Sequence, residues 1–118
     1  MTTMQQRETG RQIAPGVRSR RIGQTTILTL KGANDRTYQN TLFQLIGEVG
    51  RHVALEMGDL GNVNSGFLGL LAAGARTLNG RGGQLFLLRP PPALRRLLTL
   101  SGVGGTILST VEDESQLP

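Results

Sequence analysis

A serine at the start of a predicted helix is the residue whose chemistry this sequence most invites. In "NVNSGFLGLL" (62–71), Asn64, Ser65 and Gly66 are typical of a loop, and a helical apolar pattern begins directly after them. No acid, base or metal ligand lies beside Ser65, and N-V-N-S-G does not fit the G-x-S-x-G pattern of serine hydrolases. Ser65 could cap the helix, an interaction of about 1 kcal/mol. Alternatively, its hydroxyl could be the functional group.

Phosphorylation is the modification that this position would favour. A phosphoryl group carries nearly two negative charges. At Ser65 it would lie against the positive end of the helix dipole and near free backbone N–H groups. The fold could tolerate such a group, whereas a partner docked on the loop would meet new charge and bulk. The sequence therefore suggests a reversible interaction switch as the alternative to a simple cap.

The sequence offers few other residues that could catalyse a reaction or bind a metal. The chain has no cysteine, which excludes a disulfide scaffold, a thiolate zinc site and a cysteine nucleophile. The single histidine, His52, is expected at the start of a strand with a structural role, and Glu56 is expected to be a half-exposed strand acid. The glycine-rich "GRGGQ" (80–84) follows a predicted helix and precedes a strand, so it is interpreted as a helix-stop turn, not a phosphate-binding loop. We expect no enzyme activity, no cofactor and no metal site.

The charge is basic and unevenly distributed. The formal net charge is +5, and every cationic side chain except Lys31 is arginine. Residues 7–21 hold five arginines against one acid, Glu8, and we expect residues 1–16 to form a flexible basic arm. Nucleic-acid binding is disfavoured because no zinc finger, helix-turn-helix or aromatic RNA-binding motif is present. No apolar stretch approaches the roughly 20 residues that span a bilayer, no signal peptide is apparent, and the lack of cysteine is compatible with a cytosolic setting.

The order of predicted elements indicates one α/β domain over residues 17–118. Strands are expected over 17–22, 25–30, 52–57, 84–89 and 106–111, and helices over about 38–49, 66–80 and 90–102. Strands that alternate with helices favour a mixed, mainly parallel sheet, here of four to five strands with three to four helices. The loops 32–37 and 58–65 are expected at the functional edge of that sheet. The expected large core residues are Phe43, Phe67 and Phe86.

Three motifs in this order resemble the STAS domains, in particular the bacterial anti-sigma factor antagonists. "LKGAND" (30–35) is similar to the family's L-x-G-x-L/I-D, and "VALEMGDLGNVNSGFLGLL" (53–71) resembles its apolar strand, short loop and D-S-S/T-G-L-G element. "NGRGGQLFLLRPPPALRRLLTLSGV" (79–103) resembles its R-x-x-G-G-x-L-x-L segment and the helix after it. The resemblance runs from about residue 17 to 111 and implies the STAS fold.

The resemblance also implies a function, which is binding. In this family the unphosphorylated antagonist docks on an anti-sigma factor, often a serine-kinase-type switch protein, and frees the sigma factor. The kinase phosphorylates the serine and breaks the complex, and a phosphatase restores it. Carried over by position, Ser65 is the phosphorylation site, and Asp35, Asn64, Ser65, Gly66 and Phe67 are partner-binding residues. The resemblance further implies a cytoplasmic bacterial protein, a monomer or weak dimer, without direct nucleic-acid contact or membrane insertion.

The chain departs from the family pattern at three positions around the serine. Asn64 stands where the family has aspartate, Gly66 replaces a small hydroxyl residue, and Phe67 replaces a glycine. The loss of the acid could ease or abolish recognition by a kinase, and Phe67 could belong to the core or alter the partner surface. The alternative function is therefore a non-phosphorylated STAS adaptor or scaffold, stressosome-like or the partner of a lipid transporter, in which Ser65 only caps its helix.

Overall fold

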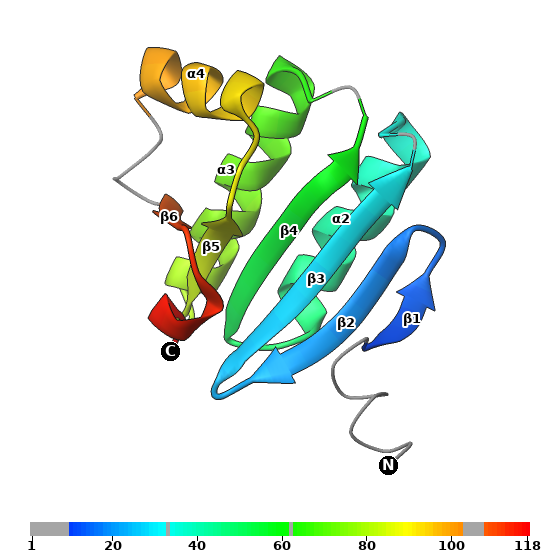
Figure 1. Cartoon of the computed structure of the whole chain (residues 1–118), viewed down its shortest axis with the longest axis vertical. Helices are drawn as coiled ribbons and strands as arrows, with labels where there is room; N and C mark the ends of the chain where they lie inside the picture. Colours follow the sequence, from blue (N-terminus) through cyan, green and yellow to red (C-terminus); the bar gives the residue numbers. More distant parts are fainter. Residues whose placement is uncertain (1–9, 33, 62, 103–107) are drawn as a thin grey trace.

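The protein folds around one mixed β-sheet. The computed structural model describes residues 10–32, 34–61, 63–102 and 108–118. These residues form a six-stranded sheet in which the order of strands equals their order in the chain (Figure 1). The strands are β1 (Arg11–Ala14), β2 (Val17–Ile22), β3 (Thr25–Gly32), β4 (His52–Leu60), β5 (Gln84–Leu88) and β6 (Leu108–Val111). The helices are α2 (Arg36–Glu48), α3 (Ser65–Asn79), α4 (Pro92–Ser101) and the short 3-10 helix η1 (Glu114–Gln116).

The pairing of the strands confirms the predicted fold class. β2 pairs antiparallel with β1 and with β3, which makes the predicted opening hairpin. β3, β4, β5 and β6 pair in parallel, each strand joined to the next by a helix. Parallel neighbouring strands require such crossover connections. The crossovers predicted from the alternation of strands and helices in the sequence are therefore confirmed. The sheet has one strand more than the predicted four to five because β1 was not anticipated.

Strand β1 corrects the prediction of a flexible arm over residues 1–16. Residues 11–14 pair with β2, and the following turn is fixed by Gly16, whose carbonyl accepts hydrogen bonds from Lys31 N (3.0 Å) and from the Tyr38 hydroxyl (2.8 Å). Gly16 has φ +72°, and a Cβ there would lie 2.4 Å from the Lys31 oxygen, so the turn requires glycine. A polar segment forms this strand because the edge of β2 supplies backbone partners that no sequence pattern reveals. Residues 1–9 lie outside the described part of the chain.

The main core lies between the sheet and the helices α2 and α3, which pack beside each other on one face of the sheet (Figure 1). Leu42 and Ile46 of α2 are fully buried there, and α3 contributes seven buried residues. The sheet side consists of alternate residues of the central strands, as expected for strands with one face against helices. Those residues include Leu28, Leu30, Val53, Leu55, Met57, Leu85 and Leu87.

One of the three predicted core phenylalanines is not in the core. Phe67 is fully buried and Phe86 is 6% exposed, but Phe43 is 41% exposed on α2. The buried face of α2 follows Leu42 and Ile46, four residues apart, and Phe43 lies about 100° around the helix from Leu42. The prediction for Phe43 was therefore wrong, because it counted the apolar residue without its place on the helix.

A C-terminal segment covers part of the opposite face of the sheet. There a smaller apolar cluster, which includes Ile27, Phe86 and Leu88, packs against the partly buried Leu117. The carbonyl of Pro118 accepts hydrogen bonds from Gln24 N and from the Thr25 hydroxyl, both at 2.9 Å. The chain after β6 thus returns across the sheet to the β2–β3 turn and shields part of this second apolar cluster.

Candidate functional site

The two loops predicted to form the functional edge meet there. β3 and β4 are parallel neighbours, so their carboxyl ends lie at the same edge of the sheet, where α2 and α3 both begin (Figure 1). Gly61 N donates a hydrogen bond of 3.0 Å to the carbonyl of Gly32, which joins the two loops directly. The candidate site therefore combines the N-terminal ends of two helices.

The cap of α3 is Asn64 and not Ser65. The backbone of Asn64 is extended, and its Oδ1 accepts a hydrogen bond from Phe67 N at 3.1 Å. Ser65 is the first residue of the helix itself. Asparagine and serine are about equally good caps, so the sequence could not decide between two such neighbours. The interpretation of Ser65 as the cap was therefore wrong. Asn64 caps α3 as an aspartate would, but without the negative charge.

Ser65 is exposed to solvent, and its hydroxyl stays unengaged within the described part of the chain. Among the described residues, none forms a hydrogen bond with Ser65 Oγ, and the first turn of α3 contains no acidic side chain. The first turn of α3 itself therefore supplies no carboxylate to offset the positive end of the helix dipole. The site combines an accessible hydroxyl with an electrostatic environment that would stabilise a phosphoryl group on it.

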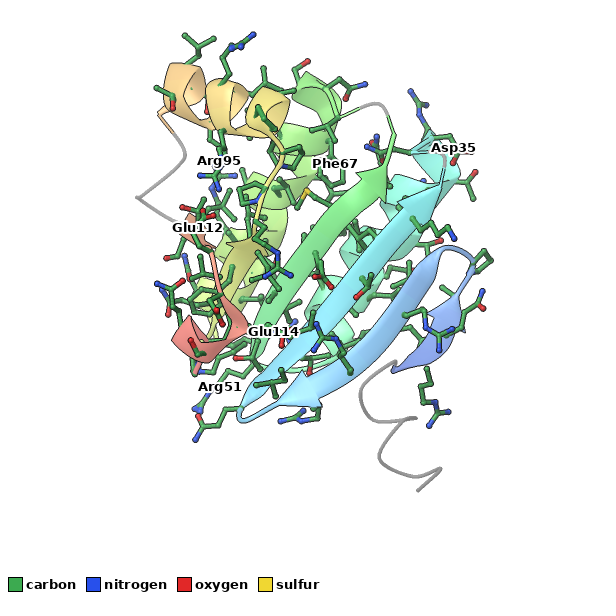
Figure 2. The ribbon with its side chains drawn as sticks, viewed as in Figure 1. Asp35, Arg51, Phe67, Arg95, Glu112 and Glu114 are labelled. Carbon is green, nitrogen blue, oxygen red and sulfur yellow. The ribbon has the colours of Figure 1, made fainter. Side chains whose placement is uncertain are left out.

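Asp35 has the same capping role in the neighbouring helix. Its carboxylate accepts a hydrogen bond of 2.8 Å from Tyr38 N, at the start of α2. The side chain remains exposed, at the carboxyl edge of the sheet (Figure 2). Its role as the cap of α2 explains the position of Asp35, and the partner-binding role of Asp35 stays a prediction.

Gly66 and Phe67, which follow Ser65 in the first turn of α3, differ in their exposure to solvent. Gly66 is exposed, and a Cβ there would lie 3.3 Å from Asn64 Oδ1, so an added side chain would press on the cap. Phe67 is fully buried and belongs to the main core. Its burial favours the core interpretation and removes the ring from the candidate partner surface, because a buried ring cannot contact a docked protein.

A hollow of about 470 Å³ lies between the β1–β2 turn, the end of β3 and the start of α2, next to Asp35. It is lined by Pro15, Gly16, Lys31, Gly32, Asp35, Thr37, Tyr38 and Thr41. Burial raises the pKa of Tyr38 above its usual value, and a hydrogen bond with the Lys31 backbone opposes that rise in part. The phenol is therefore held in its neutral form, in which it donates to the Gly16 carbonyl and fastens the β1–β2 turn to α2.

The raised pKa predicts a loss of stability at alkaline pH. The neutral phenol is favoured in the folded state, so the contribution of Tyr38 is complete below the unfolded pKa of about 10 and is lost as pH rises through the folded pKa. Urea unfolding at pH values from about 8 to 11 should show this decline, and Tyr38→Phe should flatten it. An equal decline in Tyr38→Phe would contradict the assignment to this residue.

An ion-pair cluster that the sequence analysis missed lies on the other face of the sheet. Arg20 forms ion pairs with Glu114 and, at 3.5 Å, with Glu56. Glu56 also pairs with Arg89 at 2.6 Å and accepts a hydrogen bond from Thr29 at 3.1 Å. Burial works against the charge of Arg20, but the contacts with Glu114 and Glu56 outweigh it and raise the pKa of Arg20.

This cluster explains Glu56 as a structural residue. The prediction of a half-exposed strand acid is confirmed, and strand alternation could have placed Arg20 and Glu56 on the same face. Glu114 lies in η1, so the cluster also fastens the C-terminal segment to the sheet (Figure 2). The carboxylates of the cluster are engaged in holding the fold.

The remaining sequence candidates do not add a second site. His52 lies against Phe86, with ring centroids 6.5 Å apart, and its Nδ1 is buried without a hydrogen-bond partner among the described residues. In that part of the chain no group of three or more potential ligands could hold a metal ion. None of the helices described is long and apolar enough to cross a membrane.

Comparison with known proteins agrees with this arrangement. The family described as "Mlab, STAS domain" matches residues 17–110. No curated protein matches the sequence of this chain.

Solved structures match in fold. The phosphorylated form of the Bacillus cell fate determinant SpoIIAA superposes with a TM-score of 0.66 at 20% identity, over 84% of this chain and 94% of that chain. The unphosphorylated form of the anti-sigma factor antagonist SpoIIAA gives a TM-score of 0.64 at 18% identity, over 84% and 90% of the two chains. An anti-sigma factor antagonist from Mycobacterium paratuberculosis gives 0.67 at 20% identity, over 86% and 92%. At this level of identity the likeness establishes the fold.

Proposed function

Because the chain belongs to the STAS domain family described as "Mlab, STAS domain", we propose that it is a regulatory binding module that antagonises an anti-sigma factor. It acts by docking on that protein and not by catalysis. Its partner is an anti-sigma factor or a related serine-kinase-type switch protein, in a cytoplasmic setting. The three similar structures support this proposal, since the names of two of them describe anti-sigma factor antagonists.

The observation that carries the proposed switch is the accessible hydroxyl of Ser65. Asn64 caps α3, so Ser65 can be modified without loss of the helix cap. Ser65 stands at the serine position of the motif that the chain resembles, and it is exposed at the edge where the β3 and β4 loops meet. Phosphorylation by a kinase would break the complex, and a phosphatase would restore it.

Because Asn64 stands where the family has aspartate, phosphorylation of Ser65 would turn an uncharged helix end into a negative one. With Asn64 in place of aspartate and no acid in the first turn, the unmodified end of α3 carries no negative side chain. A phosphoryl group would add nearly two negative charges to this uncharged helix end. A partner that accepts the uncharged helix end would then have to bury those charges, which is costly without cationic partners.

The test compares two replacements of Ser65. The tagged chain is isolated from its own cells, its partner is identified by mass spectrometry, and the dissociation constant is measured by calorimetry with the purified partner. Ser65→Ala should bind like the unmodified protein, whereas Ser65→Asp should bind at least about tenfold more weakly, a difference of 1.4 kcal/mol. Thr99→Asp, which adds the same charge at an exposed position of α4, is the control and should not change the affinity. Equal binding by Ser65→Ala and Ser65→Asp would exclude the switch.

A constitutive adaptor is the second candidate, favoured by Asn64 itself. The family's acid beside the serine is missing, so a kinase that reads this acid would not recognise the site. In that case the chain would stay bound to its partner throughout. The intact mass of the protein isolated from growing and stressed cells separates the two functions. A fraction heavier by one phosphoryl group, located at Ser65, supports the switch, and its absence together with a stable complex supports the adaptor.

A further inference from the structure

The segment of residues 112–118 lies across the second face of the sheet as a strap, and little of it is buried. Glu114 and Leu117 are partly buried, and the other five residues of the strap are exposed. Leu117 packs against the second apolar cluster. The members of that cluster are at most 8% exposed: Ile27, Ala54, Phe86, Leu88 and Val111. Because the strap buries so little apolar surface of its own, the hydrophobic effect contributes little to holding it.

Three arginines from different parts of the chain hold the strap. Glu112 pairs with Arg95 of α4 (Figure 2), and Glu114 pairs with Arg20 of β2. Arg89 Nη1 also donates a hydrogen bond of 3.3 Å to the carbonyl of Glu112. The side chains of Arg95 and Glu112 are 43% and 66% exposed, and ion pairs in contact with water are weak and screened by salt. The strap should therefore open locally while the sheet stays folded.

Opening of the strap would leave a basic margin around an apolar surface. The three arginines would then face one remaining carboxylate of the ion-pair cluster, that of Glu56. The apolar cluster beneath would lose the cover of Leu117. A nucleic acid would match the arginines but has no apolar side chain for the cluster. A peptide with both acidic and apolar residues matches both parts of the surface.

The backbone of Arg89 is a second, independent indication that this surface has a function. Among the described residues other than glycine, only Arg89 has a positive φ, +49°. This conformation is unfavourable for a residue with a Cβ, and such strain is concentrated at functional sites. In this conformation Arg89 Nη2 lies 2.6 Å from Glu56, while Nη1 contacts the carbonyl of Glu112. The fold thus maintains a strained residue whose side chain joins the sheet to the strap.

We propose that the strap is an autoinhibitory segment, which occupies in cis a surface that fits an acidic peptide segment of a partner protein. The strap itself shows the chemistry required: two carboxylates two residues apart, Glu112 and Glu114, and an apolar residue three positions further, Leu117. Exchange of straps between two copies of this chain would form the same contacts and still lose the entropy of association, which disfavours a second copy as the occupant. The surface lies on the opposite face of the sheet from α2 and α3, and its role does not depend on the Ser65 switch.

Hydrogen exchange followed by NMR tests whether the strap opens. Gln24 N donates to the carbonyl of Pro118, so protection of this amide reports the closed strap, whereas the amide of Leu28 inside β3 reports the sheet. Raising the sodium chloride concentration from about 0.05 to about 0.5 M should speed exchange at Gln24 at least about threefold and leave Leu28 unchanged. Exchange at Gln24 that does not respond to salt would overturn the strap, and so would an equal response at Leu28.

A peptide added in trans tests the surface beneath the strap. The full chain with Glu112→Gln and Glu114→Gln, which weaken the strap, is titrated with a synthetic peptide of residues 110–118, and the methyl signals of Ile27 and Leu88 are followed by NMR. This variant should bind the peptide at least about tenfold more tightly than the parent chain, whose own strap competes at a high effective concentration. Glu48→Gln, which removes an exposed acid on α2, is the control and should bind the peptide like the parent.

A second peptide, with glutamine at both acidic positions, decides whether charge selects the occupant. It should bind the double variant at least about tenfold more weakly, because it cannot pair with Arg20 and Arg95. Equal affinity of the two peptides, or no shift with either, would overturn the acidic-peptide surface. A stable dimer of the double variant without peptide would overturn the choice of a partner protein in favour of a second copy. If the peptide fails while Ser65→Asp still weakens the complex with the anti-sigma factor, the surface is wrong and the proposed function stands.

Discussion

Phe67→Ala is expected to lower the free energy of unfolding by about 3–5 kcal/mol, the range for removal of a fully buried aromatic ring. The ring belongs to the main core and lies two residues after Ser65, in the first turn of α3. Its loss would leave a cavity under the first turn of α3, where neighbouring strands leave little freedom to collapse. Urea unfolding followed by circular dichroism measures the change, provided that the slope of the transition is the same in both proteins.

Phe43→Ala is the matched control for this prediction. Both phenylalanines lie on helices and both were predicted as core residues, but Phe43 is 41% exposed. Its replacement should therefore change the free energy of unfolding by less than about 0.5 kcal/mol, as for an ordinary surface position. If the two variants were destabilised equally, the assignment of Phe67 to the core and of Phe43 to the surface would be refuted.

Gly83→Ala is expected to be the second strongly destabilised variant, by about 3 kcal/mol or more. A Cβ at Gly83 would lie only 1.9 Å from the carbonyl oxygen of Arg51, and no side-chain movement relieves a clash with backbone. The same carbonyl accepts a hydrogen bond from Gln84 N at 3.3 Å, at the first pair of residues that joins β4 to β5. A shift that makes room for the methyl group would disturb the pairing of the two central parallel strands.

Gly58→Ala separates this clash from the general effect of replacing a glycine. At Gly58, which lies on β4, a Cβ would meet nothing within 4 Å, and the backbone does not have a positive φ. Alanine there should leave the free energy of unfolding within about 0.5 kcal/mol of the parent value. Thermal melts of the two variants and the parent under identical conditions give the comparison. A stable Gly83→Ala protein would show that the turn after α3 can relax more than its close packing indicates.

The order and type of the elements could be predicted because they depend on local pattern. The apolar period distinguishes helices from strands, and glycine marks their ends, as at the "GRGGQ" turn where Gly82 has φ +79°. β1 was not predicted, because its residues carry no apolar pattern and the strand is defined only by its pairing with β2. β4 likewise continues to Leu60 beyond the expected residue 57, since pairing with β3 extends it.

The candidate site was predictable in position but not in the role of each atom. The carboxyl ends of β3 and β4 had to meet once the sheet was parallel, and this placed Asp35 and Ser65 at one edge. The choice of Asn64 over Ser65 as the cap depends on which backbone is extended, a property that neighbouring residues of similar preference do not encode. The ion pairs of the Glu56 cluster join residues up to 94 positions apart, from Arg20 to Glu114, and only the folded chain reveals them.

The strands lie in the sheet in the same order as in the chain, and this order affects how the protein can fold during synthesis. Each strand hydrogen-bonds to the strand synthesised immediately before it, so the sheet can grow at one edge while the chain leaves the ribosome. The return of the C-terminal segment is the exception, because the Thr25–Pro118 hydrogen bond spans 93 positions and raises the contact order. Co-translational folding can therefore build the sheet strand by strand before this segment covers part of its second face.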